Sequence, residues 1–487
     1  RLDRAVGAAL RSLGARAAEG GLQSGVALVP DAAQAFSIRA ATARAAGRSL
    51  DLMYYVWRGD VAGQLLGREV LRAADRGVRV RLLLDDVFAL GRQRVLASLD
   101  THPQIEVRLF NSIKWRAFGK AVFLLEMAVG GWHLNRRMHN KAWIADGKVA
   151  IVGGRNIGDE YFGLDTDGAI SFRDLDLVIA GPAAEEATGV FERYWHSALA
   201  RPACEVAPSA DARGGLGRLR HELADVAHRP EAEELLAPLR QPAVRHLRRG
   251  LTLLSAGAIR VVADPPEKAR RGLGARRRAR AAGGIAPEIA DALREARREA
   301  LLISPYFVPG RRGLALLLDL RRRDVHVAVV TNSLAATDVV AVHGGYAKYR
   351  RALLQAGVEL FELKPGPVGE GASLLGSRGA ALHTKAFVVD GLRAFVGSFN
   401  LDHRSAALNT EMGAFVQGAG VARGVAAEHH RLTDPALSWR LVLEDGKLGW
   451  RDEFNGAPRT LHQEPVASLA RRVVAGIARA LPIEEQL

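Results

Sequence analysis

The sequence lacks three features that would each have assigned it to a class of protein. It has one cysteine, Cys204, in 487 residues, which excludes an internal disulfide framework and a cysteine-rich metal cluster. Its best candidate for a long apolar run, residues 121–131, contains Glu126 and falls short of the ~18 residues of a membrane-spanning helix. Acidic residues number 53 against 68 lysines and arginines, so we expect attraction to phosphate groups, anionic lipid or nucleic acid.

The remaining composition is that of a globular protein. Hydrophobic residues make up 48% and charged residues 25% of the chain, whose length corresponds to roughly three domains. The first residue is arginine rather than methionine, which is compatible with removal of an upstream signal or anchor. Composition therefore leaves the cellular compartment open.

The chain contains an internal repeat. Residues 139–156 read HNKAWIADGKVAIVGGRN and residues 383–400 read HTKAFVVDGLRAFVGSFN, so the two segments align without a gap. Two apolar strands, separated by a helical stretch, precede each copy, at 49–57 and 78–86 and again at 301–308 and 325–333. This β-α-β order predicts a duplicated α/β fold of two mixed sheets flanked by helices, with a pseudo-twofold site between the halves.

The repeat also predicts the domain organisation. We expect one domain at residues 25–200 and a second at 255–487, the second ending in an amphipathic helix. Residues 201–254 are rich in Ala, Arg, Glu and Pro with helical periodicity, which indicates a helical linker or insertion.

Each repeat carries the pattern His-x-Lys-x4-Asp-Gly between apolar residues, which predicts a β-hairpin. Alternate residues of a strand face the same side, so His139 should project with Lys141, and His383 with Lys385. Two matches with parallel flanks leave little room for the alternative that these histidines are unrelated surface residues.

Other residues of the repeat have predicted structural roles. Asp146 and Asp390 fall at the Asp-Gly turns, where we expect them to stabilise the structure rather than to act on a substrate. The second hairpin strands end in small residues, Gly153 in the first half and Gly397-Ser398 in the second, which would let a bulky anion approach. The first half has Gly154 in place of the serine, so the halves are not equivalent.

Two histidines, two lysines and two asparagines around one axis suit phosphodiester chemistry. One histidine can attack phosphorus and form a phosphohistidine, while the other protonates the leaving alcohol. The lysines, with Asn156 and Asn400, can stabilise the phosphoryl oxygens, so we expect neither a metal nor a cofactor. Each histidine needs a carboxylate to hold its tautomer, and Asp174 and Glu411 occupy matching positions downstream of their motifs.

The duplicated motif resembles that of the phospholipase D superfamily, from about residue 25 onward. The flanking segments resemble bacterial cardiolipin synthases, closest to the cardiolipin synthase C subgroup: RRMHNKAWIADGKVAIVGGRNIGDEYF (136–162), FRDLDLVIAGP (172–182), ISPYFVPG (303–310), TNSLAATD (331–338) and VHGGYAKYR (342–350). The resemblance implies a phospholipase D fold and an enzyme that transfers a phosphatidyl group to the glycerol hydroxyl of phosphatidylglycerol, without a metal. It also implies His139 as nucleophile and His383 as general acid, an order that the near symmetry of the halves leaves open.

A lipid transferase implies a peripheral position on a membrane surface, by resemblance the bacterial inner membrane, with the face left open. One candidate contact is an apolar helical stripe formed by Trp115, Phe118, Val122 and Leu125, for which an ordinary core helix is the alternative. A second is the C-terminal repeat of Val466, Leu469, Val473, Ile477 and Leu481, which suits packing on the domain equally well. A third is the basic segment 268–280, expected to be an exposed loop, with the cations Arg276, Arg277 and Arg278.

Three enzymatic functions fit these residues. The first is a cardiolipin-forming transferase acting on phosphatidylglycerol, with phosphatidylethanolamine as another candidate lipid substrate. The second is a phospholipase D that uses water and releases phosphatidic acid. The third is a phosphodiesterase acting on nucleic acid, which the net charge of +15 would suit. The apolar stripes favour lipid, so we expect no nucleic-acid partner, and the intact motifs disfavour a non-enzymatic binding module.

Overall fold

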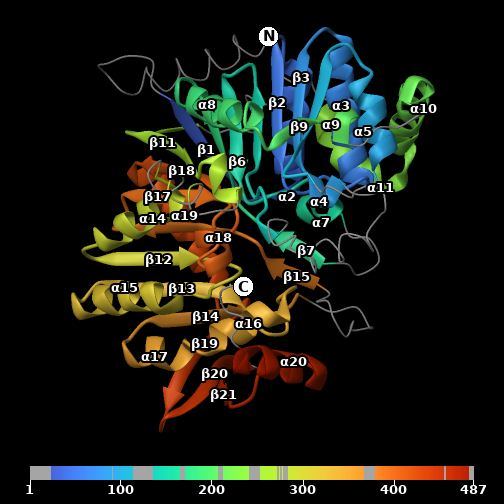
Figure 1. Ribbon diagram of the computed structural model, residues 1–487. Coiled ribbons are helices and arrows are strands. Elements are labelled where there is room, and N and C mark those ends of the chain that lie inside the picture. Colours follow the sequence, from blue (N-terminus) through green and yellow to red (C-terminus); the bar gives the residue numbers. More distant parts are fainter. Residues whose placement is uncertain are drawn as a thin grey trace.

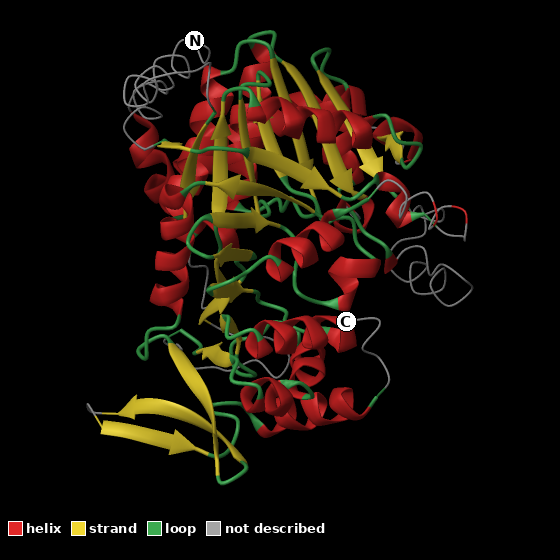
Figure 2. Cartoon of the chain, turned by 90° about the vertical axis from the view of Figure 1, so that its left-hand side faces the viewer, coloured by secondary structure: helices red, strands yellow, loops and turns green. Residues whose placement is uncertain are grey.

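The structure is a computed structural model that describes residues 24–89, 92–112, 135–164, 170–206, 212–240, 253–270, 274, 277, 283–366, 379–454 and 457–481. Two large mixed β-sheets form the two halves of the molecule, with the first half above the second in Figure 1. Figure 2, a quarter turn away, shows strands projecting at the lower end, where Figure 1 labels β20 and β21.

The first sheet has nine strands, of which β2, β3 and β4 are parallel to one another and the remaining pairs antiparallel. Their order is β10 (Leu254–Ser255), β1 (Gly25–Val29), β8 (Asp176–Ala180), β6 (Val149–Gly153), β5 (Ala142–Ala145), β2 (Ser49–Tyr54), β3 (Arg79–Asp85), β4 (Ile105–Phe110) and β9 (Ala200–Pro202).

The second sheet repeats this arrangement and adds two strands at its far edge. Its order is β11 (Ile259–Ala263), β18 (Met412–Gln417), β17 (Arg393–Gly397), β16 (Ala386–Val389), β12 (Glu299–Ile303), β13 (His326–Asn332), β14 (Glu359–Leu363), β19 (Ser438–Glu444), β20 (Lys447–Phe454) and β21 (Ala457–Leu461). The run from β1 to β9 matches the run from β11 to β19 strand by strand. The predicted duplicated α/β fold is therefore confirmed.

Helices occupy equivalent places in the two halves. The main helices of the first half are α2 (Ala32–Ala45), α3 (Val61–Asp75) and α8 (Ala183–Trp195), and those of the second are α14 (Ile285–Arg294), α15 (Gly310–Arg322) and α19 (Ala419–Leu432). Asp31 begins α2 by accepting a hydrogen bond from the backbone N–H of Gln34, and Asp60 begins α3 in the same way from Gly63.

The remaining helices and one small sheet complete the described chain. The α-helices are α4 (Asp86–Ala89), α5 (Gln93–Asp100), α7 (Asp159–Phe162), α9 (Ala203–Val206), α10 (Ala212–Asp225), α11 (Pro230–Leu236), α16 (Val340–Ala347), α17 (Arg350–Gln355), α18 (His403–Ala407) and α20 (Leu469–Ala480). Single 3-10 turns lie at Val226–His228, Ala237–Arg240 and Pro266–Ala269. A separate two-stranded parallel sheet pairs β7 (Ile170–Arg173) with β15 (Gly379–Leu382) and so joins the halves. Among the described residues, no helix is both long and apolar enough to cross a membrane.

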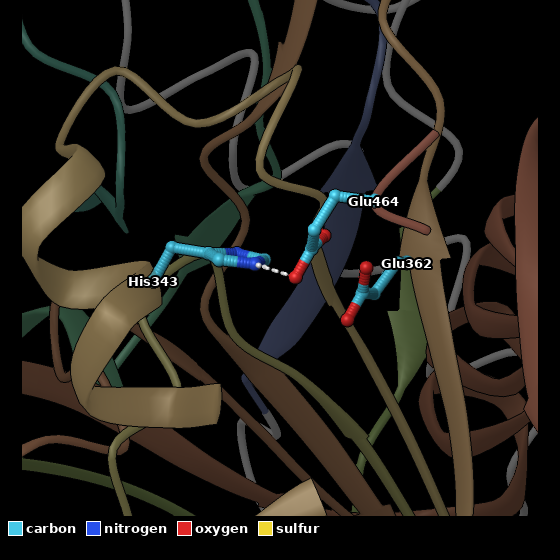
Figure 3. A group of neighbouring side chains, drawn as sticks. All are labelled: His343, Glu362 and Glu464. Carbon is cyan, nitrogen blue, oxygen red and sulfur yellow. Dashed lines mark hydrogen bonds and ion pairs between the residues drawn. The ribbon is translucent and has the colours of Figure 1, made fainter. Parts of the chain in front are cut away.

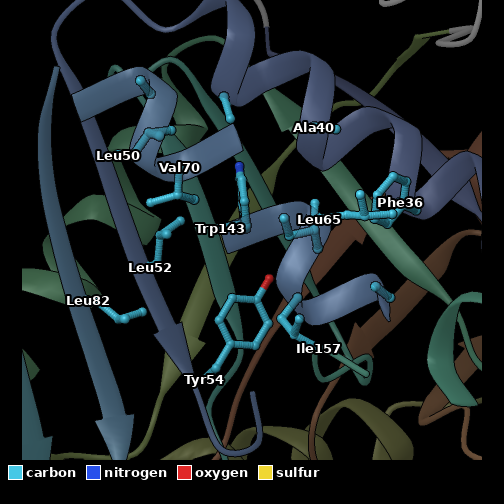
Figure 4. Packing of buried hydrophobic residues seen from close by; sticks show 14 of the residues in the cluster. Phe36, Ala40, Leu50, Leu52, Tyr54, Leu65, Val70, Leu82, Trp143 and Ile157 are labelled. Atoms are coloured by element: carbon cyan, nitrogen blue, oxygen red, sulfur yellow. The ribbon is translucent and has the colours of Figure 1, made fainter. Parts of the chain in front are cut away.

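Three large hydrophobic cores and one small cluster stabilise the described part of the chain. The outer core of the first half packs α2 and α3 on the sheet around Trp143, Tyr54 and Leu52 (Figure 4). Helices α10 and α11, from the segment expected to be a linker, join this core through Leu219 and Leu235. The central core contains residues of both sheets together with α8 and α19, and the third core lies on the outer face of the second sheet. The central core is shared, so the halves bury apolar surface against each other.

The Asp-Gly turns of the two repeats have the same unusual backbone. Asp146 and Gly147 have φ angles of 54° and 64°, a left-handed conformation that suits a tight hairpin. The Asp146 carboxylate accepts hydrogen bonds from the backbone N–H groups of Gly47, Arg48 and Ser49, which lead into β2. Asp390 likewise accepts from the three N–H groups that lead into β12. Both side chains therefore tie a hairpin turn to the first residues of a central strand.

We predict that Asp146→Ala lowers the free energy of unfolding by about 3 kcal/mol, because three backbone donors lose a charged acceptor. Denaturant titration of the variant beside Asp390→Ala measures this loss. Below the unfolding transition, both variants should keep activity within a few-fold of the parent protein. Loss of activity at unchanged stability would contradict a structural role.

Candidate active site

The two motif histidines lie in extended segments just before β5 and β16, where the halves meet. His139 and His383 are buried, with 8% and 6% of their surface exposed. The hairpins lie where the pattern predicts them, but each His-x-Lys segment precedes its strand rather than belonging to it. The histidines are therefore held by contacts outside their own hairpins.

His139 is held by the second half of the chain. Its backbone N–H donates to the carbonyl of Thr410 (2.9 Å), and the N–H of Thr410 donates to the carbonyl of Arg137 (2.9 Å). This backbone pairing places Glu411 beside the ring, with its Oε2 2.8 Å from Nδ1 of His139.

His383 is held in the same way by the first half. Strand β15, which leads into it, pairs with β7, and its backbone N–H donates to the carbonyl of Arg173 (2.8 Å). Asp174 follows directly and places its Oδ2 2.6 Å from Nδ1 of His383. Each half therefore supplies the carboxylate for the histidine of the other half.

These pairs determine the chemical state of the histidines. A carboxylate accepts from Nδ1–H, so it leaves Nε2 of each ring free to act as a base or nucleophile. Burial lowers the pKa of each of the two histidines well below the ordinary value for histidine, and repulsion from Lys141 and Lys385 lowers it further. Burial raises the pKa of Glu411 to about 7 and also raises that of Asp174.

The two lysines lie at the same centre. The Nζ of Lys141 donates to the carbonyl oxygen of His139 (2.7 Å), and Lys385 donates to the carbonyl oxygen of His383. Burial lowers the pKa of Lys141 well below its ordinary value and that of Lys385 to about 8. Their charges therefore depend on the carboxylates opposite and on any anion that binds.

The asparagines contribute unequally. The Nδ2 of Asn156 donates to the hydroxyl of Tyr161 (2.8 Å), and its Oδ1 accepts from the N–H of Val56 (3.2 Å). The Oδ1 of Asn400 is buried without a hydrogen-bond partner among the described residues. Asn156 thus positions a tyrosine whose ring lies 5.3 Å from that of His383, while the Asn400 amide keeps an unused polar atom.

The sequence patterns missed two residues that hold the backbone in place just before each motif histidine. Asp85, at the end of β3, accepts from the side chain of Arg137 and from the backbone N–H of Met138 (2.9 Å), just before the first histidine. Asn332, at the end of β13, exchanges two hydrogen bonds with the backbone of Leu382, just before the second. Their equivalent positions in the two aligned strands were the signal that could have found them.

The halves differ where the sequence has Gly154 against Ser398. The Ser398 hydroxyl donates to Glu411 (2.5 Å), the carboxylate that holds His139. A Cβ at Gly154 would lie 2.4 Å from Oδ1 of Asp174, so a serine there would have to displace this carboxylate. The shorter aspartate lies close to its own hairpin, whereas the longer glutamate leaves room for a side chain.

The other motif glycines are required by packing between strands. A Cβ at Gly153 would lie 2.6 Å from the carbonyl oxygen of Leu175, and one at Gly397 would lie 2.5 Å from that of Met412. The space that we expected an anion to use is therefore filled by the neighbouring strand.

One group of side chains outside this centre has the donor types of a metal site. Atoms of His343, Glu362 and Glu464 lie within 4.8 Å of one another (Figure 3). The guanidinium of Arg350 lies among them, 2.6 Å from Glu464 and 2.8 Å from Glu362. It already supplies the positive charge that a metal ion would bring, so we assign these residues a structural ion-pair network.

The first predicted apolar stripe and two of the three predicted arginines lie outside the described residues. These are Trp115, Phe118, Val122, Leu125, Arg276 and Arg278. Arg277 is described and exposed. Lys268, expected in the same exposed basic segment, is instead only 11% exposed and paired with Asp264 (2.7 Å).

The duplicated fold and the crossed histidine pairs define the class of protein, and comparison identifies the family. The model of the family described as "Cardiolipin synthase, PLD-like domain" matches residues 40–195 and 289–433. The chain belongs to this phospholipase D-like family, as its motifs predict.

Similar proteins and a similar solved structure agree with this assignment to the family. The chain is 38% identical over 471 residues to cardiolipin synthase C of Escherichia coli (strain K12), an alignment that covers 95% of this chain and 96% of that protein. It is 26% identical over 398 residues to a cardiolipin synthase of Geobacillus kaustophilus (strain HTA426), covering 81% of this chain and 63% of that protein. The crystal structure of phosphatidylserine synthase from Haemophilus influenzae Rd KW20 matches 99% of this chain and 100% of that chain, with a TM-score of 0.60 and 13% identity, which confirms the predicted fold.

The difference between the halves gives a test of the crossed pairing. Gly154→Ser should reduce kcat roughly 100-fold, because the new side chain displaces Asp174 and with it His383. Adding Asp174→Glu should restore a large part of the loss, since the pair then reproduces Ser398 and Glu411. Ser398→Ala is the matched control and should cost about tenfold or less, as one hydrogen bond to a carboxylate. Equal activities of the single and double variants would contradict the steric explanation.

Proposed function

We propose that the chain is a phosphatidyltransferase that forms cardiolipin from phosphatidylglycerol through a phosphohistidine. The observation that carries the proposal is the pair of buried histidines, each oriented through Nδ1 by a carboxylate of the other half, with two lysines at the same centre. Membership of the cardiolipin synthase family supports the same activity.

In the proposed reaction His139 is the nucleophile. Its free Nε2 attacks the phosphorus of a phosphatidyl donor, and His383 protonates the oxygen of the alcohol that leaves. His383 then accepts the proton from a glycerol hydroxyl of phosphatidylglycerol, whose oxygen attacks the phosphohistidine and releases His139. Lys141 and Lys385 stabilise the negative charge on the phosphoryl oxygens in both steps.

The donor and the membrane contact are further parts of the proposal. Phosphatidylglycerol can serve as both donor and acceptor, and phosphatidylethanolamine is the alternative donor, because only the leaving alcohol differs. We infer that the protein acts as a peripheral protein on a bacterial inner membrane, where both lipids are met at the surface.

Hydrolysis is the competing outcome at the same centre. Water in place of the glycerol hydroxyl would release phosphatidic acid by the same two steps. Cleavage of nucleic acid would use the same histidines too, but the family match and the exposed apolar residues favour lipid.

The proposal predicts that His139→Ala and His383→Ala each abolish cardiolipin formation in detergent micelles of phosphatidylglycerol, with unchanged thermal unfolding. Mass spectrometry of the lipids gives the product, and peptide mapping gives the adduct. With a p-nitrophenyl phosphodiester, whose leaving group needs no proton, His383→Ala should accumulate a covalent adduct on His139, because attack can still occur while acceptor activation is lost. An adduct on His383 in His139→Ala would reverse the two roles. Phosphatidic acid as the main wild-type product would replace transfer by hydrolysis, and faster cleavage of single-stranded DNA would replace lipid by nucleic acid.

The pKa shifts predict the pH dependence of the attacking step. With a soluble p-nitrophenyl phosphodiester, the leaving group needs no proton, so kcat/KM reports the nucleophile and the lysines of the free enzyme. The low pKa of His139 keeps it neutral, so the acid limb should lie below pH 6.5. Lys385, with a pKa of about 8, loses its charge as pH rises, so activity should fall through about pH 8.

Lys385→Arg is the control for this profile. A guanidinium remains charged throughout the range, so the alkaline limb should move to higher pH even if the rate is lower. An unchanged alkaline limb in this variant would exclude Lys385 as its origin.

A further inference from the structure

Helix α20 has the reverse of the usual orientation for a surface helix. The side chains packed against the domain are those of Arg471, Ala475 and Ala478, which are buried. The large apolar side chains point outward, and their exposed fractions are 76% for Leu469, 52% for Val473, 42% for Val474, 56% for Ile477 and 45% for Leu481. We call these five residues the outer stripe. Val466, just before the helix, is 73% exposed.

The small residues on the inner face let α20 lie very close to α16. A Cβ at Gly344 of α16 would lie 2.5 Å from the carbonyl oxygen of Ala475, so the two backbones nearly touch. Arg471 crosses to the neighbouring loop and donates to the carbonyl oxygens of Leu334 (2.9 Å) and Thr337. The helix is therefore attached through its backbone, its small inner side chains and Arg471, without using its large apolar side chains.

The segment before α20 is held by the ion-pair network of Arg350 with His343, Glu362 and Glu464, of which Figure 3 shows the last three. Glu464 lies between β21 and α20, and Arg350 and His343 bind it from α17 and α16. Burial acts against ionisation, but the neighbouring Arg350 guanidinium outweighs it and lowers the pKa of Glu464 to about 2. This charged contact holds the start of the helix in place at neutral pH.

The loop that Arg471 binds leads to the active site. Asp338 follows Thr337 and accepts a hydrogen bond from the hydroxyl of Tyr306 (2.8 Å). Its charge acts on Lys385, whose pKa it raises against the larger effect of burial. The helix thus contacts this loop through Arg471, and Asp338 of the loop acts electrostatically on Lys385 of the catalytic centre.

We propose that α20 is a docking helix that binds the surface of an anionic lipid bilayer through the outer stripe. The inference rests on the proposed function and adds the surface by which the enzyme meets its substrate. The helix has three arginines and no acidic residue. Arg479 is exposed, whereas Arg472 donates to the side chain of Gln463 (3.1 Å) and to the carbonyl oxygen of Glu464 (2.9 Å). A basic helix with an exposed apolar stripe is typical of helices that lie in the plane of a membrane. Apolar side chains then enter the acyl boundary while Arg479 meets anionic head groups.

A second copy of the chain fits this surface less well. Stable protein interfaces bury about 800 Å² on each partner, more than five side chains on three turns of helix can supply. A bilayer needs only a narrow apolar stripe with cations beside it.

The test compares two matched double variants. Leu469→Ser with Ile477→Ser removes the two most exposed side chains of the stripe. Val95→Ser with Leu392→Ser removes side chains that are 40% and 54% exposed elsewhere on the surface. Binding is measured by co-sedimentation with vesicles of phosphatidylglycerol and phosphatidylcholine, and with vesicles of phosphatidylcholine alone.

We expect the stripe variant to bind the anionic vesicles about tenfold or more weakly and the control variant to bind as the parent does. Arg479→Glu should weaken binding to anionic vesicles about tenfold and leave binding to phosphatidylcholine vesicles unchanged. Cleavage of a soluble phosphodiester should be the same in all variants. Cardiolipin formation should fall on vesicles but not in micelles.

Three results would overturn the proposal. Equal vesicle binding by the stripe and control variants would show that the helix does not dock. A lower unfolding temperature of the stripe variant alone would show that another part of the chain covers the stripe in solution. A parent dimer that the stripe variant converts to a monomer would assign the surface to a second copy. Vesicle binding through the stripe without cardiolipin formation would instead leave the docking surface standing and refute the proposed function.

Discussion

The catalytic centre depends on one constraint, which is that each histidine is completed by a carboxylate from the opposite half. Glu411 reaches His139 because Thr410 pairs with the backbone on either side of Met138, and Asp174 reaches His383 because β7 pairs with β15. Neither half alone has an oriented histidine. The central core shared by both sheets holds the halves at this register, so burial of apolar surface and orientation of the imidazoles have the same structural origin.

The two-fold symmetry is incomplete where the chemistry needs two different roles. A two-step transfer requires one histidine to attack and the other to move protons. On the His139 side the carboxylate is a glutamate that also accepts from Ser398, whereas on the His383 side it is an aspartate that leaves no room for a side chain at Gly154. The two carboxylates therefore have different surroundings, and the two histidines are not in equivalent environments. Two halves with the same fold can in this way give their histidines different roles.

The sequence predicts local features of this protein well because local features depend on neighbours along the chain. The Asp-Gly turns, the hairpins and the repeated strand order follow from spacing alone, and the structure has them. The partner of each carboxylate could not be derived, because Glu411 and His139 are 272 residues apart and either pairing satisfies the same spacing. Periodicity also found the apolar repeat of α20, but it cannot say which face a helix turns to the protein. The orientation of α20 is set by the close packing of Gly344, Ala475 and Arg471, which leaves the larger side chains exposed.

The charges at the centre explain how a histidine with a low pKa can serve as the acid. Two carboxylates and two lysines surround the imidazoles in the free protein, and burial keeps both imidazoles neutral. A phosphodiester brings one further negative charge into this buried place, which favours protonation of the groups around it. In the proposed mechanism one imidazole is already committed to attack, so the proton is taken up by His383, next to the leaving oxygen. In this mechanism, substrate binding and protonation of His383 are coupled. His383 therefore carries its proton only while a substrate is bound.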